Sequence, residues 1–445
     1  MNQEAGLSAD FKVTELGLLP EEWQISLLDQ LVEFTHKPRN LSTVEKSIIP
    51  FISMALITSD GSGKCRFNEK TGTSITSGVY CEPGDLLFAK ITPCLENGKQ
   101  CIVPDDLNYP FAYATTEVYA LKPKREYIDR TFLFHYLRYP PVRIELASKM
   151  EGTTGRQRLA KHVLENLSIP IPPLPEQRAI AHVLSSIQRA IEAQDKVISA
   201  ARELKKSITR HLFTYGPVSI NKADQVELKV TEIGLMPENW ELSKLGDLVD
   251  IQYGVQAAVA NLKDLTKGIP ILTNVNITNN GKLDLSLLRY YELQSKQRDK
   301  LLLHKGDMLF NWRSGSSSHV GKTAIFDTDG EYTYSSFILR FRPKETIDNE
   351  YLYHFFTNLK AINFFAEKRS QSSVNSVFNA SLSSKIPVAV PPMSTQKSIA
   401  AILKSTNNNL EAEENSKSAL QTLFKTMLHV LMTGQLRVKE LQIEN

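Results

Sequence analysis

Residues 12–23 read KVTELGLLPEEW, and residues 229–240 read KVTEIGLMPENW. Nine of the twelve positions are identical, and the other three exchange similar or polar residues. A match of this length within one chain indicates an internal duplication. Two copies are too few for a solenoid, in which several units bury a continuous core by stacking. The sequence therefore predicts two similar halves.

Further matches keep the two halves in register. They pair GDLLF at 84–88 with GDMLF at 306–310, Gly98-Lys99 with Gly321-Lys322, and IPIPPLPEQRAIAHVL at 169–184 with IPVAVPPMSTQKSIAAIL at 386–403. The offset between matching residues stays between 217 and 223 along the chain, with two extra residues near the prolines of the second half. Because the offset is nearly constant, both halves are expected to share one architecture.

Each half is expected to begin with short strands and to continue into a helix. About 150 residues after each opening are rich in β-type segments interrupted by Gly, Asn and Pro. Residues 132–147 (FLFHYLRYPPVRIELA) and 351–366 (YLYHFFTNLKAINFFA) then carry apolar residues at helical spacing, which predicts one helix in each half. Polar segments at 151–158 (EGTTGRQR) and 369–376 (RSQSSVNS) follow these helices.

A much longer helix is predicted after the prolines of each half. In the first, Pro175 suits the first helical turn, and apolar or small residues recur at 3,4 spacing as far as Gly216. The second has the same character and ends at Gly434. A seam sustained for about five heptads favours a coiled coil over two ordinary core helices, and about 38 helical residues span roughly 55 to 60 Å.

These signals predict an α+β fold of two repeated α/β lobes, joined by two long antiparallel coiled-coil helices with pseudo-two-fold symmetry. The expected boundaries are 1–174 for the first lobe, 175–216 for the central helix, 217–227 for a linker, 228–393 for the second lobe, 394–434 for the C-terminal helix and 435–445 for a tail.

Composition narrows the class of protein. A chain of 445 residues with 42% hydrophobic and 23% charged residues has room for two or three globular domains. It begins without a signal peptide and contains no run of about eighteen apolar residues, so we expect a cytoplasmic protein without a membrane span. A net charge of +3 permits a nucleic-acid partner if basic residues cluster locally. The cysteines form no C-x-x-C pair, which favours reduced thiols over a zinc site; they are Cys65, Cys81, Cys94 and Cys101.

Residues 313–323, RSGSSSHVGKT, resemble a phosphate-binding loop only superficially. That motif needs four residues between its glycines, whereas five separate Gly315 from Gly321, and Ser316 stands where Gly is required. The following TAIF is β-branched and apolar, which predicts a strand instead of the helix that a nucleotide site requires. A duplicated nucleoside triphosphatase is therefore disfavoured.

Catalytic signatures are missing from the sequence. It contains no H-E-x-x-H, G-x-S-x-G or G-x-G-x-x-G motif, and no N-P-P-[YF] that would present an amino group to a methyl donor. Asp85 and Asp307 each follow Gly ahead of a strand, where turn formation is favoured over metal ligation. His36, His304 and His319 have no partner at metal-ligand spacing. We therefore expect no catalytic residue, no metal site and no cofactor.

The chain resembles the specificity subunits of type I restriction-modification enzymes along nearly its whole length. The resemblance rests on the T-E-[LI]-G-x-x-P-E-x-W openings, the G-D-x-L-F strands, G-T-T-G-R-Q-R at 152–158, P-P-L-P-E-Q-R-A-I-A at 172–181 and L-M-T-G-Q-L-R-V at 431–438. Its most specific part is Pro-Pro-x-x-x-Gln ahead of a long helix, which occurs twice. The second copy departs from the pattern, with Thr395 in place of Glu176 and no counterpart of Arg156.

The resemblance implies a subunit that performs no chemistry itself. Each lobe would be a target recognition domain that reads one half of a bipartite, asymmetric sequence in double-stranded DNA. The helices would set the spacing and dock two methyltransferase subunits, and restriction/translocase subunits would complete the complex. Those partners would supply the methyl donor and ATP. A duplicated scaffold that binds proteins or sugars remains the alternative.

Donor-rich segments supply candidate DNA contacts. Arg can pair with guanine and Asn with adenine, while Lys, Ser and His suit phosphates. The first-lobe candidates are Lys64, Arg66, Lys70, Lys90, Asn97 and Lys99, and the second-lobe candidates are Asn274, Asn276, Arg313, Ser316, His319 and Lys322. The polar segments ahead of the prolines are expected near the lobe–helix junction and suit phosphates; their candidates are Thr154, Arg156, Arg158, Ser372 and Asn375.

Overall fold

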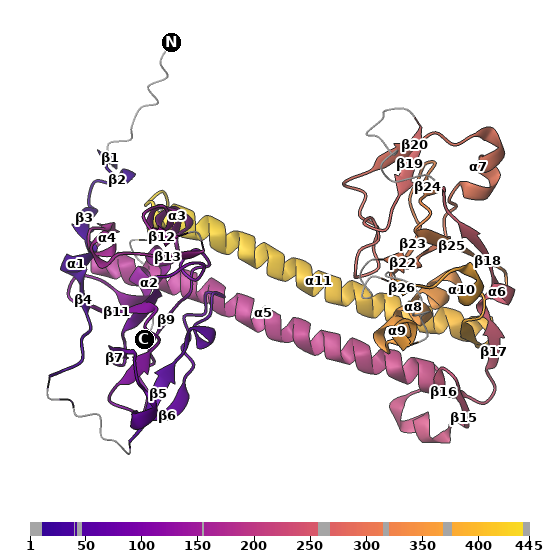
Figure 1. Cartoon of the computed structure of the whole chain (residues 1–445), viewed down its shortest axis with the longest axis horizontal. Coiled ribbons are helices and arrows are strands. Elements are labelled where there is room, and N and C mark those ends of the chain that lie inside the picture. The colour runs from indigo at the N-terminus through magenta and orange to yellow at the C-terminus, as the bar shows by residue number, and fades with distance from the viewer. Residues whose placement is uncertain are drawn as a thin grey trace, which may run out of the picture. The chain divides into compact units, whose positions relative to one another are not determined.

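The computed structural model divides into two compact units (Figure 1). One comprises Met1–Val197 with Glu413–Asn445, and the other Ile198–Ala412. The structure describes residues 11–39, 41, 47–153, 155–256, 268–314, 320–367 and 376–438. Each unit contains one lobe together with a part of both long helices, and the two units are described in turn.

The first unit opens with a hairpin of β1 (Phe11–Thr14) and β2 (Gly17–Pro20), in which Val13 lies opposite Leu18. Gly17 has a φ of 97°, a left-handed value that a side chain would strain. The chain then reaches Trp23, which is fully buried. Next come β3 (Gln24–Leu27) and the single-turn helix α1 (Leu28–Leu31). The repeated opening motif therefore ends on an indole that anchors it in the core.

Two four-stranded sheets form the body of this lobe. The order of the first is β4 (Val32–Phe34), β11 (Val118–Pro123), β8 (Leu86–Ala89) and β9 (Gln100–Ile102), all antiparallel. The order of the second is β6 (Asn68–Thr71), β5 (Ile48–Ile52), β10 (Ala112–Ala114) and β7 (Val79–Cys81). Short 3-10 turns lie at Met54–Leu56 and Gly72–Ser74. The carboxylate of Asp85, just before β8, accepts the N–H of Glu82 at 2.8 Å, which is the expected turn-forming role.

Helices and a second hairpin complete the lobe. They are α2 (Arg130–Arg138), α3 (Pro140–Ser148), β12 (Glu151–Thr153), β13 (Arg156–Arg158), α4 (Lys161–Glu165) and β14 (Ser168–Ile171), which pairs with β3. The prediction of a single helix over 132–147 is wrong. Pro140 and Pro141 have no N–H to continue the ladder of α2, and Pro140 instead occupies the first turn of α3.

The second unit has a similar element order. Its elements are the 3-10 helix Ile220–Gln225, β15 (Leu228–Thr231), β16 (Gly234–Pro237), β17 (Glu241–Lys244), α6 (Leu245–Leu248), β18 (Val249–Tyr253), β19 (Ile269–Leu272), β20 (Arg289–Tyr291), α7 (Ser295–Leu301), β21 (Met308–Asn311), β22 (Arg313–Ser314), β23 (Thr323–Ile325), β24 (Thr333–Tyr334), β25 (Ile338–Pro343), α8 (Asn349–Ala361), α9 (Phe364–Glu367), β26 (Ser376–Val377), α10 (Ala380–Ser383) and β27 (Pro387–Val390). The sheet β18-β25-β21-β23 matches β4-β11-β8-β9 strand for strand, whereas the second sheet of this unit has three strands in the order β20-β19-β24. Here too the predicted single helix is two, separated at Asn363, whose φ is 60°.

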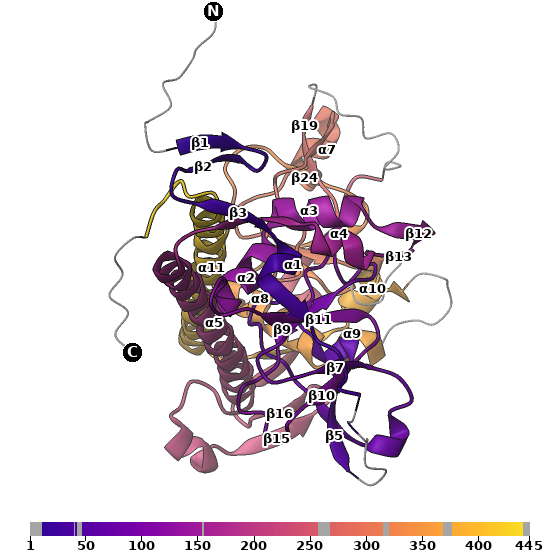
Figure 2. The ribbon, with the colours of Figure 1, turned by 90° about the vertical axis from the view of Figure 1, so that its left-hand side faces the viewer.

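Two long helices, α5 (Leu174–Tyr215) and α11 (Met393–Met432), each contribute to both units and run in opposite directions. In the first unit Gln194 of α5 donates to the carbonyl of Glu413 in α11 at 3.1 Å. In the second, Leu212 of α5 and Leu403 of α11 share one core. The helices lie side by side in Figures 1 and 2. An α+β fold of two lobes with paired long helices is thus confirmed.

The Pro-Pro-x-x-x-Gln signature has a structural cause. The side chain of Gln177 accepts the N–H of Asp129 at 2.8 Å and donates to the carbonyl of Pro172 at 2.9 Å. Gln396 makes the same two bonds, at 2.8 and 2.9 Å, with Asp348 and Pro391. Each glutamine therefore joins the start of a long helix to the N-cap of the short helix beside it.

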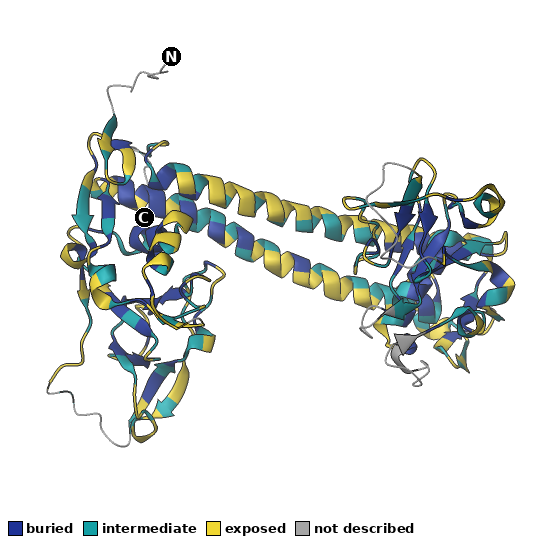
Figure 3. Cartoon of the chain, turned by 45° about the horizontal axis from the view of Figure 1, so that its top comes forward, coloured by how far each residue is buried: buried dark blue, intermediate teal, exposed yellow. Residues whose placement is uncertain are grey.

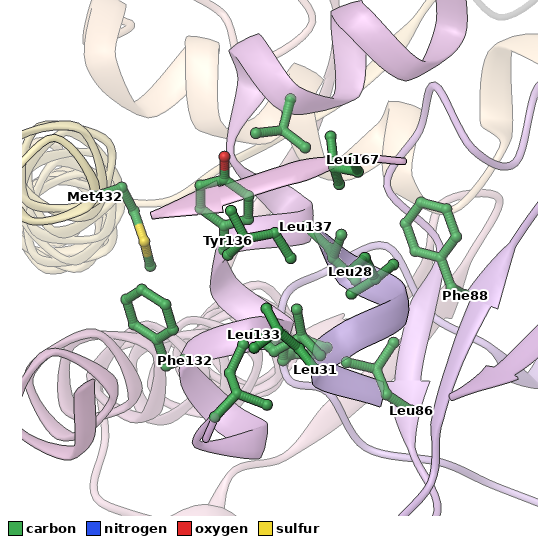
Figure 4. Packing of buried hydrophobic residues seen from close by; sticks show 14 of the residues in the cluster. Leu28, Leu31, Leu86, Phe88, Phe132, Leu133, Tyr136, Leu137, Leu167 and Met432 are labelled. Carbon is green, nitrogen blue, oxygen red and sulfur yellow. The ribbon is translucent and has the colours of Figure 1, made fainter. Parts of the chain in front are cut away.

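The end of a long helix contributes buried residues to the core of each lobe. Leu428, Leu431 and Met432 of α11 lie in the core of the first lobe. Figure 4 shows the Met432 side chain pointing toward Phe132 of α2. Figure 3 shows buried residues gathered inside each unit and exposed residues along the outer faces of both helices. Within the described part of the chain, no helix is long and apolar enough to cross a membrane.

Candidate nucleic-acid interface

The segment 90–99, which links β8 to β9, is held at both ends by the sheet. The N–H of Ala89 donates to the carbonyl of Lys99 at 3.2 Å, and Gly98 turns the chain with a φ of 70°. The N–H of Thr92 donates to the carbonyl of Gln157 at 3.0 Å. Leu95 is buried in the lobe core. The segment therefore presents its remaining side chains from a fixed backbone.

The hairpin β12–β13 places arginines beside this segment. Arg158 forms a β-bridge with Ile91, and the N–H of Leu159 donates to the carbonyl of Lys90 at 2.8 Å. Arg156 and Arg158 are exposed. Burial, and after it the Arg158 charge, lowers the pKa of Lys90, whose ammonium lies 4.3 Å from the Tyr119 ring centroid. Lys90 and Arg158 thus come together as neighbouring cations.

A further cation, Arg143 of α3, was not singled out from the sequence. Its guanidinium donates to the carbonyl of Glu96 at 3.2 Å and covers Gly98, where a Cβ would lie 2.7 Å from Nη1. Burial lowers the pKa of Arg143. Burial, and then the Arg143 charge, lowers the pKa of Arg138 to about 10. The only available signal was two arginines on a predicted helix, which is common on any solvated face.

The other first-lobe candidates are more dispersed. Lys64 forms an ion pair with Glu192 of α5 at 2.6 Å, and its backbone forms a bridge with Ile102. Lys99 donates to the carbonyl of Met54 at 2.9 Å. Arg66 and Asn97 are exposed. Lys70 is on β6 of the other sheet, with its ammonium 3.9 Å from the Phe51 ring centroid. Lys90, Asn97, Lys99 and Arg158 therefore lie on or beside one turn, and Lys70 lies on the other sheet of the lobe.

In the second lobe, the described residues on either side of 315–319 are tied to the sheet in a similar way. The N–H of Asn311 donates to the carbonyl of Lys322 at 2.8 Å, and Arg313 pairs with Val377 in the two-stranded sheet β22–β26. The guanidinium of Arg313 lies 5.8 Å from the Phe337 ring centroid. Burial lowers the pKa of Lys322, and burial followed by the Lys322 charge lowers that of Lys360. Lys360 is a second cation that sequence reasoning missed.

Several candidates lie outside the described residues: Thr154, Ser316, His319, Ser372 and Asn375. Asn274 is half-buried on a turn. Lys322 is followed by the strand β23, which begins at Thr323, and not by a helix, and Lys322 donates to the carbonyl of Ile277 at 3.4 Å. The strand–loop–strand prediction is confirmed, and the arrangement differs from a nucleotide-binding loop.

The prediction of Asn276 as a base-reading residue is wrong for this structure. Asn276 is 4% exposed. Its Oδ1 accepts from the N–H and the hydroxyl of Thr273, both at 2.9 Å. Its Nδ2 donates to the carbonyls of Asp284 and Leu287 at 2.8 and 3.0 Å. With both amide groups occupied, Asn276 fixes a turn in the lobe and has no donor left for a base edge.

Comparisons with known proteins agree with the duplicated architecture. Residues 20–199 and 237–422 match the family described as the type I restriction modification DNA specificity domain. The matched residues make up most of the chain. The chain therefore belongs to this family of type I restriction-modification specificity subunits.

Individual relatives cover different shares of the chain. It is 28% identical over 335 residues to the type I restriction enzyme MjaVIII specificity subunit of Methanocaldococcus jannaschii, covering 72% of this chain and 73% of that one. It is 32% identical over 246 residues to the EcoAI specificity subunit of Escherichia coli, covering 55% of this chain and 39% of the relative. These matches place the chain among specificity subunits from distant organisms.

Two solved structures share the fold. A chain from a type I restriction-modification system, studied for complex assembly and conformational transition, has a TM-score of 0.57 at 20% identity, covering 94% of this chain and 99% of that one. The S subunit from M. genitalium has a TM-score of 0.55 at 15% identity, covering 92% and 96%. At these identities the likeness concerns the fold alone.

Proposed function

We propose that each lobe reads one half of a bipartite, asymmetric DNA target and that the long helices set the unread gap between the halves. The observation that carries the proposal is the repeated cationic turn. Equivalent strands, β8 and β21, are each followed by a segment whose ends are anchored by backbone hydrogen bonds and flanked by lysine and arginine. A turn with this surplus of donors suits phosphates and base edges, which present mainly acceptors.

We assign the cations of the two segments either to binding the DNA phosphates or to recognising bases. In the first lobe Arg156 and Arg158 project from a hairpin, so they can follow a phosphate backbone or enter a groove. In the second lobe Arg313 begins the short strand β22, two residues after β21, and a bidentate arginine discriminates guanine by about 1 to 3 kcal/mol. The partly buried Lys90 and Lys322 suit phosphates, because an ammonium acts as a point charge without planar selectivity.

The proposed partners are double-stranded DNA, two methyltransferase subunits and, in the full complex, restriction/translocase subunits. The chain is proposed to be non-catalytic, with methyl transfer and cleavage performed by those partners. This division follows from its family and from the missing catalytic motifs in its sequence. A compartment shared with chromosomal DNA, the bacterial or archaeal cytoplasm, fits this role.

Methylation sequencing tests the proposal lobe by lobe. The chain, or a variant, is expressed with its methyltransferase subunits in cells that lack other methylation. Arg156→Ala with Arg158→Ala should weaken or relax only one half of the methylated sequence, and Arg313→Ala only the other. Lys122→Ala, a cation that pairs with Glu82 and is not among the candidate contacts, is the matched control. Loss of both halves together in either variant would favour a duplicated scaffold without independent reading.

A further inference from the structure

A shorter repeat than the opening hairpin occurs later in each lobe. Residues 57–65 read ITSDGSGKC, and residues 277–283 read ITNNGKL. Both segments begin with Ile-Thr and have Gly-Lys just before their last residue. In each lobe an antiparallel β-bridge joins the first residue of the segment to the last. We call these two segments the bridged turns.

A glycine with a left-handed backbone precedes the lysine in both bridged turns. Its φ is 66° at Gly63 and 79° at Gly281. A side chain is strained at such a φ. In each turn the threonine hydroxyl also donates to the side chain two residues after it. The two turns therefore share backbone geometry as well as sequence.

Each of these glycines lies against an aromatic ring of the neighbouring helix. A Cβ on Gly63 would lie 3.1 Å from Cζ of Phe134 in α2. A Cβ on Gly281 would lie 2.1 Å from Oη of Tyr353 in α8. The two aromatic residues are 219 positions apart, the same offset as between the glutamines at the starts of the long helices. Because atoms in contact are normally about 3.5 to 4.0 Å apart, only a glycine lets the turn approach the ring so closely.

Each bridged turn also contacts a long helix. Its lysine forms an ion pair there, Lys64 with Glu192 of α5 and Lys282 with Glu411 of α11. In the first lobe the buried Gln188 of α5 donates as well, to a carbonyl of the turn at 3.1 Å. Exposed ion pairs stabilise a fold only slightly. The packing of the glycine on the aromatic ring is therefore the main restraint that both turns share.

A carbonyl at or near the start of each turn holds a candidate DNA contact. In the second lobe Lys322 donates to the carbonyl of Ile277, the first residue of the turn, at 3.4 Å. In the first lobe Lys99 donates to the carbonyl of Met54, three residues before the turn, at 2.9 Å. These are the matching lysines of the repeated Gly-Lys pair. An ammonium has three N–H donors, so a lysine held by one carbonyl can still bind a phosphate.

We propose that the bridged turns are joints that position Lys99 and Lys322 for DNA phosphates, with Phe134 and Tyr353 as the positioning residues. The aromatic ring fixes the turn, and the turn fixes the carbonyl that holds the lysine. Each joint thereby connects the helices of a unit to a DNA contact of the same unit. The inference rests on the proposed function, because it takes the two lysines as phosphate contacts.

The second lobe offers the sharper test, because its glycine approaches the aromatic side chain more closely. Gly281→Ala places a Cβ against the hydroxyl of Tyr353. Adding Tyr353→Phe removes the atom that this Cβ would meet. The matched control is Gly330→Ala, since Gly330 also has a positive φ, 101°, but its Cβ would meet nothing nearer than 3.6 Å. Tyr353→Phe alone is the second control, because the first lobe already has a phenylalanine at this position.

The full chain is assembled with its methyltransferase subunits and assayed on a duplex that carries the sequence found by methylation sequencing. Gly281→Ala should raise the KM for DNA about ten-fold and leave kcat unchanged, because DNA binding is weakened and methyl transfer is performed by the partner. The slope of log affinity against log salt should fall by about 0.9, the value for one lost phosphate contact. The double variant should recover part of the KM, and both controls should match the unchanged chain.

A purely structural defect gives a different result. Fewer folded molecules lower the rate at saturating DNA but change neither the KM nor the salt slope. Thermal melting measures the folded fraction of each variant. Gly63→Ala makes the same test in the first lobe, and carries it alone if Gly281→Ala does not fold. Its Cβ would lie 3.1 Å from the ring, so its KM should rise less than that of Gly281→Ala.

An unchanged KM and salt slope in the glycine variants, or no recovery in the double variant, would overturn the joint. The proposed function is tested separately. If Arg313→Ala relaxes one half of the methylated sequence while the glycine variants bind DNA normally, half-site reading stands and only the joint is wrong.

Discussion

At the scale of single residues, Arg437 joins the segment after α11 to the first lobe. Its guanidinium donates to both carboxylate oxygens of Glu176, at 2.6 and 2.8 Å, and to Glu22 at 2.8 Å. The indole N–H of Trp23 donates to the same Glu176 carboxylate at 3.2 Å. The Glu176 side chain is only 3% exposed. The buried Glu176 carboxylate therefore depends on the Arg437 guanidinium to offset the cost of burying its charge.

Arg437→Ser should destabilise the first unit by about 2 to 4 kcal/mol, because it leaves Glu176 buried without a charge partner. The second lobe suggests the control. It has Thr395 at the position of Glu176. Ser219 corresponds to Arg437, because each follows the glycine at the end of its long helix, Gly216 or Gly434, by the same number of residues. Adding Glu176→Thr should therefore recover part of the loss. Urea unfolding measures both effects, and a double variant no more stable than the single one would contradict this account.

Two buried histidines occupy equivalent positions in α2 and α8. Burial lowers the pKa of His135 to about 3 and that of His354 to about 4. An unfolded histidine has a pKa of about 6.5. Because the folded pKa is lower, the stabilisation from each neutral imidazole is fully present above pH 6.5 and is lost as the pH falls from 6.5 toward 3 or 4.

Stability should therefore decrease between pH 7 and pH 5, by at most about 1.4 kcal/mol per pH unit for each histidine. His135→Gln should flatten this dependence in the first unit, and His354→Gln in the second. His162→Gln, a change at an exposed position, should leave it unaltered. Melting temperatures at half-unit pH steps are the measurement, and an unchanged slope in the His135 variant would show that another group titrates.

Residue roles were the hardest feature to predict from the sequence. Arg156 and Arg158 were singled out because they lie in a short polar segment just ahead of the prolines, which is expected near the lobe–helix junction. Asn276 was assigned wrongly, since its residue type suits adenine equally well whether the amide is free or satisfied by Thr273 and Asp284. Arg143 was missed because its position over Gly98 depends on a packing contact 45 residues away in the chain.

At the scale of elements, each lobe forms a matching ion pair with a long helix, in addition to the glutamine bonds at the start of that helix. Lys64 pairs with Glu192 of α5, and Lys282 pairs with Glu411 of α11. The two glutamates are 219 residues apart, the same offset as Gln177 and Gln396. Both lysines stand one residue before a β-bridge residue, Cys65 in one lobe and Leu283 in the other. The duplication therefore kept this tie although the surrounding segments diverged.

Glu192→Gln should strengthen DNA binding in the complex with methyltransferase subunits at low salt. The exposed ion pair contributes at most about 1 kcal/mol, so the fold should tolerate its loss. A released Lys64 can contact one more phosphate, which steepens the plot of log affinity against log salt by about 0.9. Lys282 should respond in the same way to Glu411→Gln. Weaker binding with an unchanged slope would show that the tie positions the lobe instead of restraining the lysine.

The long helices were predictable because several local signals agree at each end. Pro175, the 3,4 apolar seam and Gly216 bound one helix, and the seam and a closing glycine, Gly434, recur in the other. The shorter helices were predicted as continuous because apolar periodicity runs through both of their breaks. Pro140 could have indicated the first break. Asn363 could not indicate the second, since its left-handed φ depends on packing around Phe364 and Phe365.

At the scale of the whole molecule, the duplication predicted two halves but not how each half is completed. Leu431 and Met432 fill the first lobe, and Leu212 and Phe213 fill the second. Each lobe core therefore needs residues from the helix that follows the other lobe in sequence. Apolar periodicity shows that these residues are buried without showing against which core. This exchange makes the two helices a shared part of both recognition units.

Lengthening both helices together tests whether they set the gap in the DNA target. Four helix-forming residues are inserted in α5 between Val197 and Ile198 and in α11 between Ala412 and Glu413, where the two units divide. Each helix then gains about 6 Å, roughly two base pairs at about 3.4 Å of rise. Matched insertions keep pairs such as Gln194 with Glu413 in register. An insertion in α5 alone shifts one seam against the other and should weaken the complex.

The half-sequences should survive because neither lobe surface changes, while the unread gap grows by one or two base pairs. Four residues exceed one helical turn slightly, so the added rotation must be absorbed by DNA twist or by the lobe–helix joints, with some loss of affinity. Methylation sequencing of cells carrying the paired insertion decides the matter. An unchanged gap with altered half-sequences would show that contacts within the lobes, and not the length of the helices, determine the spacing.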